Sequence, residues 1–133
     1  MNVLELKKMI YAFLITKSSR VFDTEAPAKV AYPYVVYTLE NSFTDLNQRR
    51  EDFDLTVDIY DNNQFDATDI DALASSIDGD GAIVSASGLH RKHYFTNGTI
   101  QTDIYRLSRD TIFEEDENIK HIQLTYEVMT YLS

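Results

Sequence analysis

Aspartates are the residues of this sequence whose number and spacing could support chemistry. Calcium loops of the EF-hand type need oxygen ligands at fixed offsets, a central glycine and a terminal bidentate glutamate. Asp78-x-Asp80-Gly81 has no such continuation, so we expect these carboxylates to cap helices or lie on a solvated strand face, with no metal site. The group comprises Asp54, Asp58, Asp61, Asp66, Asp69, Asp71, Asp78 and Asp80.

The other catalytic patterns are also missing from the sequence. A pair of carboxylates working as acid and base needs surroundings that separate their pKa values. Asp54 and Asp58 share a strand face with Thr56 and Tyr60, which predicts solvent around them. There is no Gly-x-Ser-x-Gly elbow and no phosphate-binding glycine loop, and the chain has no cysteine. We expect no catalytic residue, no cofactor and no enzyme activity.

Basic residues are few, and they gather in two segments. The chain has a formal net charge of −10, which argues against binding nucleic acid through its phosphates. A zinc site needs three or four ligands, but His90 and His93 would point to opposite faces of a strand. We expect the basic segments to meet an acidic surface on a neighbouring copy. The candidate interface residues are Arg49, Arg50, His90, Arg91, Lys92 and Tyr94.

The length of the chain predicts one domain over residues 1–133. A chain of this size can bury a single core, and no apolar run reaches the roughly 20 residues that span a bilayer. The first residues have a helical pattern and no cleavage site of a signal peptide. We therefore expect a soluble protein.

The best-defined strands lie near the middle of the chain. Pro33 cannot donate to a ladder and favours an extended predecessor, so it marks a strand start. Residues 34–39, which follow it, are mostly β-branched or aromatic, as in buried strands. Apolar and polar residues alternate over 53–60, which predicts a half-buried strand. Residues 41–49 between them are polar, so we expect an antiparallel pair with a long loop.

Two helices are predicted from apolar spacings of three and four residues, over 2–17 and 64–77. Ile70, Leu73, Ala74 and Ile77 form the stripe of the second, and residues 78–81 after it read as a flexible break. Asn97-Gly98 is a strong hairpin signal between possible strands at 84–95 and 99–106. Residues 110–118 look like an acidic loop, and 119–132 alternate as a last strand. The sum is an α+β fold: a mostly antiparallel sheet with two helices packed on one face.

Three short segments carry a resemblance to a known family. They are Ala26-Pro27, Pro33-Tyr34-Val35-Val36-Tyr37 and Val57-Asp58-Ile59-Tyr60-Asp61. With the order of elements, they make the chain resemble the tail terminator family of long-tailed, non-contractile bacteriophages, also called tail completion or tail-to-head joining proteins.

The resemblance implies a virion structural protein that caps the tail tube, stops its growth and joins the tail to the head. Its partners would be itself, in a ring that is typically a hexamer, the tail tube protein and the head completion or connector protein. It would assemble in the host cytoplasm and reside at the head-proximal end of the tail. From the charge and the hydropathy we expect no sequence-specific binding of nucleic acid and no membrane partner. A head-side connector or minor structural adaptor, a small-ligand binding domain and a hydrolase remain as alternatives.

Overall fold

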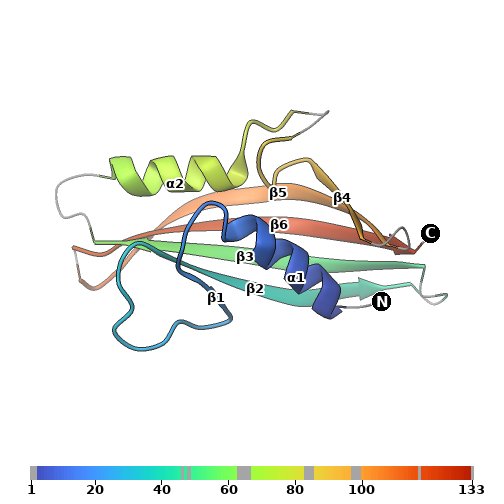
Figure 1. Cartoon of the computed structure of the whole chain (residues 1–133), viewed down its shortest axis with the longest axis horizontal. Coiled ribbons are helices and arrows are strands. Elements are labelled where there is room, and N and C mark those ends of the chain that lie inside the picture. Colours follow the sequence, from blue (N-terminus) through green and yellow to red (C-terminus); the bar gives the residue numbers. More distant parts are fainter. Residues whose placement is uncertain are drawn as a thin grey trace.

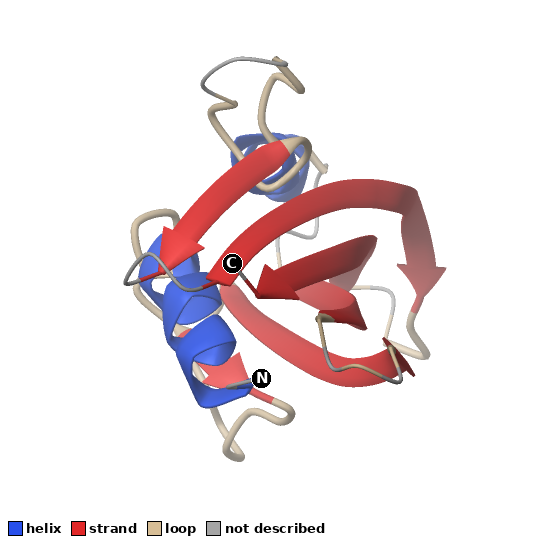
Figure 2. Ribbon diagram, turned by 90° about the vertical axis from the view of Figure 1, so that its right-hand side faces the viewer, coloured by secondary structure: helices blue, strands red, loops and turns tan. Residues whose placement is uncertain are grey.

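The structure is a computed structural model that describes residues 3–45, 47, 49–62, 67–82, 86–96, 100–116 and 118–132. A long, strongly curved β-sheet carries two α-helices (Figures 1 and 2). The helices are α1 (Val3–Leu14) and α2 (Thr68–Asp78). The strands are β1 (Val21–Asp23), β2 (Tyr34–Thr44), β3 (Arg50–Asp61), β4 (Lys92–Thr96), β5 (Ile100–Phe113) and β6 (Lys120–Leu132).

The sheet has six strands in the order β1-β2-β3-β6-β5-β4. Every neighbouring pair is antiparallel except β1 with β2, which run parallel. The C-terminal strand β6 therefore lies in the middle of the sheet, between β3 and β5. This order brings residues near 58 and near 121 side by side, although they are far apart in sequence.

One face of the sheet carries the hydrophobic core and both helices. Alternate residues of β3 and β6 lie opposite one another, as Leu55 does to Tyr126 and Val57 to Leu124, so their side chains share a face. The buried residues of α1 and α2 belong to the same cluster. The expected α+β fold, with a mostly antiparallel sheet, is confirmed. The helical residues of the cluster are Leu6, Ile10, Leu14, Ile70, Ala74 and Ile77.

The strands predicted at 34–39, 53–60, 99–106 and 119–132 are confirmed, whereas the one expected within 84–95 is confined to β4 (Lys92–Thr96). Two strands run further than expected. β2 continues to Thr44 past a bulge near Asn41, and β5 continues to Phe113, where an acidic loop was expected. In both cases a long partner strand offers hydrogen-bonding groups to a polar segment, and pairing overrides the weak strand propensity. The short strand β1 was missed, since three residues show no periodicity.

The segment after α2 is packed and not a flexible break. Gly79 ends the helix with a φ of 83°, and a side chain on it would collide with the backbone of Gly88. The amides of Leu89 and His90 donate to the carbonyls of Ile77 and Asp78. Two glycines thus allow two backbones to approach closely, and Leu89 becomes a fully buried core residue.

Candidate functional site

A buried polar cluster ties the end of α2 to the sheet. The Asp78 side chain is only 8% exposed and accepts a hydrogen bond from the Tyr126 hydroxyl at 2.9 Å. Arg106 of β5 donates to its second oxygen at 2.6 Å. Burial and the nearby carboxylate together raise the pKa of Tyr126. All three groups satisfy one another, so this cluster stabilises the fold and offers no free group for chemistry.

The opposite face of the sheet holds a histidine between two carboxylates. His121 of β6 contacts Asp58 of β3 through Nε2 at 2.7 Å and Glu114 through Nδ1 at 2.8 Å. Its side chain is 8% exposed. Burial lowers the pKa of His121, but the hydrogen bonds and charges of Asp58 and Glu114 outweigh it, so the net pKa is raised. The arrangement therefore favours a protonated ring that donates to both carboxylates.

Aromatic rings extend this cluster across the sheet. Tyr60 stacks on His121 with a centroid separation of 4.2 Å, and Tyr34 stacks on Tyr60 at 4.8 Å. Burial and the Asp58 charge raise the pKa of Tyr60 to about 12. A cavity of about 350 Å³ lies beside them, closed on one side by residues 24–27 of the loop after β1. We call Tyr34, Tyr60, His121, Asp58 and Glu114 the histidine cluster.

The histidine cluster has the geometry of a structural clamp. A general base needs a ring nitrogen that can accept a proton from a substrate, and both nitrogens of His121 are already engaged by carboxylates. The clamp instead joins β3 to the turn after β5, because Glu114 immediately follows Phe113, the last residue of that strand.

Sequence reasoning missed this cluster. It placed Asp58 on a solvated face, whereas the Asp58 side chain is only 16% exposed and also accepts from Gln123 at 3.0 Å. The expectation of solvent around Asp58 was therefore wrong. Alternation put Asp58, Tyr60 and Gln123 on polar faces, but the pairing of β3 with β6 decides that these faces coincide. No local pattern reports that pairing.

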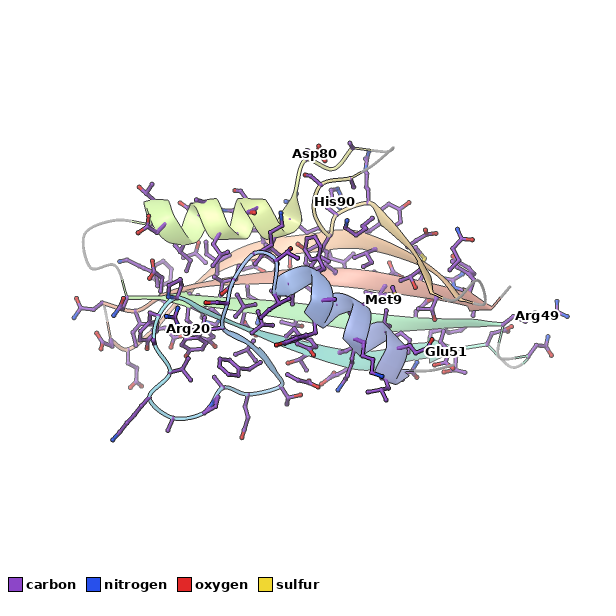
Figure 3. The ribbon with its side chains drawn as sticks, in the orientation of Figure 1. Met9, Arg20, Arg49, Glu51, Asp80 and His90 are labelled. Atoms are coloured by element: carbon purple, nitrogen blue, oxygen red, sulfur yellow. The ribbon has the colours of Figure 1, made fainter. Side chains whose placement is uncertain are left out.

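The predicted interface residues lie at two separate places (Figure 3). Arg49 is exposed at the end of the sheet where β2 turns into β3. Arg50 is committed within the fold, because it makes two hydrogen bonds to Asp52, at 2.9 and 2.8 Å. Its guanidinium also lies over the rings of Phe43 and Tyr131.

The second basic segment lies beyond α2, far from Arg49 (Figure 3). His90 accepts a hydrogen bond from the Arg106 amide at 3.0 Å, and Arg91 has a positive φ of 63°. The Lys92 ammonium lies 5.0 Å from the centroid of the Phe13 ring of α1. Tyr94 lies in β4, but the structure does not describe its side chain. The proposed docking role of these residues stays a prediction.

The structure was also searched for a ligand pocket, a metal site and a membrane-spanning helix. A hollow of about 430 Å³ lies between the start of α2 and the β5–β6 turn. Phe113, one of its lining residues, is 93% exposed. In the described part of the chain, no group of three or more acidic or histidine side chains could hold a metal ion. Nor is any helix there long and apolar enough to cross a membrane.

Comparison with known proteins gives a likeness of fold. No family model matches the chain, and no curated protein matches it either. Among solved structures it is similar to a chain described as "Virion of native gene transfer agent (GTA) particle", at 16% sequence identity and a TM-score of 0.54. The likeness covers 92% of this chain and 91% of the other. The two chains therefore share a fold over nearly their whole length.

Proposed function

We propose that this chain is a structural protein of a phage-like virion, which caps the tail tube, ends its growth and presents the tail-side surface for head joining. The observation that carries the proposal is the likeness of fold to a chain of a gene transfer agent virion over 92% of this chain. A likeness that spans both chains almost completely concerns the whole architecture and not one common motif.

The segments that resemble tail terminators support the proposal through their positions. Tyr34–Tyr37 and Val57–Asp61 fall on the adjacent strands β2 and β3 and pair in register, with Val35 opposite Ile59. Ala26 and Pro27 line the cavity beside these strands. The three resembling segments are thus one structural unit, although they are separated in the sequence.

The role we propose has no catalytic step. The histidine cluster uses both nitrogens of His121 inside the fold, which suits a structural role. The ring that capping requires would be built from copies of this chain. Each copy would contact its two neighbours through two different surfaces.

Purified partners test the proposal against the head-side alternative. The protein is mixed with purified tails that lack it, and separately with purified portal complexes, and binding is measured by co-sedimentation. Binding to tails, with restored ability to join filled heads, is expected. Binding to portals alone would identify a head-side connector and contradict the tail role.

A further inference from the structure

Two strands of the sheet extend well beyond the short strands that flank them. β1 pairs with only the first part of β2, at residues 35–37. In the same way, β4 pairs with only residues 100–104 of β5. Within the described residues, no other strand pairs with the outer side of β2 or of β5. We call residues 38–44 of β2 and residues 107–113 of β5 the two open stretches.

The open stretches are accessible to a partner. Residues 40–44 are all exposed, and so are most of residues 107–113. Both stretches also expose large apolar side chains: Phe43 is 49% exposed, Leu107 59% and Phe113 93%. An unpaired strand edge presents a row of backbone N–H and C=O groups that invites another strand. Two such edges in one chain therefore favour pairing with a further strand.

The β5 open stretch directs backbone groups away from the sheet. The Arg91 amide donates to the Ile104 carbonyl from the outer side. Successive residues of a strand alternate in the direction of these groups, and the bulge after Arg106 shifts the alternation by one residue. Among the described residues, no backbone hydrogen bond from another segment reaches the open stretch. The outward-facing residues are therefore Arg109, Thr111 and Phe113.

The two open stretches fit each other in position and in direction. Each is the C-terminal part of its strand, and in Figure 1 the β2 stretch lies at the right end of the sheet and the β5 stretch at the left end. β2 and β5 run in opposite directions, because every step from β2 through β3 and β6 to β5 is antiparallel. A second copy that is shifted along the strands thus brings its β2 stretch antiparallel to the β5 stretch, with the helices of both copies on the same side. Its β1 then continues the line of β5, and the first copy's β4 continues the line of β2, without overlap.

We propose that the open stretch of β5 pairs with the open stretch of β2 in a second copy of this chain, with Leu39 opposite Phe113. This register covers the most exposed large apolar side chain in the described residues with a leucine that packs against the core. It also places Glu40 opposite Ile112 and away from Asp110, whose like charge directly opposite would be unfavourable.

The contact joins copies head to tail, because two different edges meet. Each copy is displaced along the strands relative to the one before it, and such a stagger is what a sheet requires in order to close into a barrel. Pairing of this kind extends one sheet through successive copies. The inference rests on the proposed function, since it names the two surfaces by which the copies of the ring meet.

Disulfide formation between single-cysteine variants tests the contact, because the chain has no cysteine of its own. Glu40→Cys protein is mixed with Ile112→Cys protein under mild oxidation, and the rate of heterodimer formation is followed by intact mass. The matched control replaces Glu40→Cys by Asp54→Cys, which is exposed and lies directly opposite Glu40 on β3, one strand inside the edge. The first heterodimer should form faster, since opposite residues of a non-hydrogen-bonded pair are close enough for a disulfide. Equal rates would overturn the proposal.

A proline at the edge of β5 provides a second readout. Thr111→Pro removes an outward-facing N–H that the β5–β6 ladder does not use, so the monomer should fold, which circular dichroism checks. In the Ile112→Cys chain it should slow heterodimer formation with Glu40→Cys about tenfold, because a backbone hydrogen bond is lost and the proline ring opposes pairing. Thr111→Ala keeps the N–H and should leave the rate unchanged. An unchanged rate with folded Thr111→Pro protein would contradict backbone pairing.

Binding of the parent chain to purified tails separates this contact from the proposed function. Normal capping of tails, without faster formation of the Glu40→Cys and Ile112→Cys heterodimer, would remove the contact and leave the function. Faster formation of that heterodimer, without binding of the parent chain to tails, would remove the function and leave the contact.

Discussion

His121 connects three parts of the chain through one imidazole ring. Its two nitrogens contact carboxylates on β3 and on the turn after β5, and its face stacks on Tyr60. Protonation decides how strong these contacts are, because hydrogen bonds between charged groups are worth more than neutral ones. The clamp should therefore depend on pH.

Replacing His121 tests this dependence. The pKa of His121 is raised in the folded protein, so its stabilising effect is complete below the unfolded value of about 6.5. The effect is lost as pH rises through the folded pKa. The stability advantage of the parent over His121→Gln should be about 1–3 kcal/mol at pH 6 and should shrink towards pH 9. Urea unfolding across this pH range measures it.

Asp58→Asn is the matched control for that experiment. Removing one of the two carboxylates weakens the preference for the protonated ring, so the pH dependence should flatten. An advantage of the parent that instead grows with pH would show that His121 is neutral in the folded protein.

Asp78 should matter for stability and not for assembly. Asp78→Ala leaves the hydroxyl of the fully buried Tyr126 without its acceptor, which costs about 2 kcal/mol. The lost ion pair adds little, because the Arg106 side chain is 37% exposed and solvent screens it. Asp54→Ala, at an exposed position of β3, should lie within about 0.5 kcal/mol of the parent. Equal thermal stability of the two variants would contradict the buried role.

The burial of individual residues could be predicted where it follows from the alternation of apolar and polar residues along one strand. Alternation correctly assigned Leu124 and Tyr126 to the buried face of the last strand. The roles of Asp58 and Asp78 could not be predicted, because their partners lie 63 and 48 residues away in the chain. A carboxylate looks the same in a sequence whether it is solvated or held by a distant partner.

At the scale of elements, α2 is held by a narrower stripe than its sequence predicted. Ile70, Ala74 and Ile77 are buried in the core, whereas Leu73 is only partly buried against it. Ile77→Ala should therefore cost about 2–5 kcal/mol, as truncation of a buried aliphatic side chain does. Leu73→Ala should cost about 1 kcal/mol. Thermal melts of the two variants decide the order, and a larger loss for Leu73→Ala would mean that α2 is rotated.

Element types were easier to predict than element ends. The helices and the main strands follow from periodicity, while the ends of β2 and β5 follow from partners that the sequence does not reveal. The hairpin expected at Asn97-Gly98 is confirmed through its strands, since β4 and β5 pair antiparallel on either side of it. The turn itself lies outside the described residues. Long-range pairing, not local propensity, sets the extent of this sheet.

At the scale of the whole molecule, assembly should depend on positive charge and not on a metal. Arg91→Glu with Lys92→Glu should leave the monomer folded but slow its attachment to tails, with a strong dependence on salt. Binding to tails at several salt concentrations, with circular dichroism of the monomer, measures both effects.

The Arg49→Glu variant and treatment with EDTA are the controls for that experiment. Arg49→Glu tests the other basic end of the sheet without disturbing the fold, whereas reversal of Arg50 would strand the buried Asp52 carboxylate. EDTA should change nothing. Normal attachment of the Arg91 and Lys92 variant, together with loss of attachment in EDTA, would make the aspartates the functional site.

The central claim is that this protein ends the growth of a tail tube. The most direct measurement is electron microscopy of particles from a mutant in which its gene is deleted, beside the same mutant supplied with the intact chain. We expect tubes of abnormal length and filled heads without tails, and both defects should disappear on complementation. Tails of normal length joined to filled heads in the deletion mutant would contradict the claim.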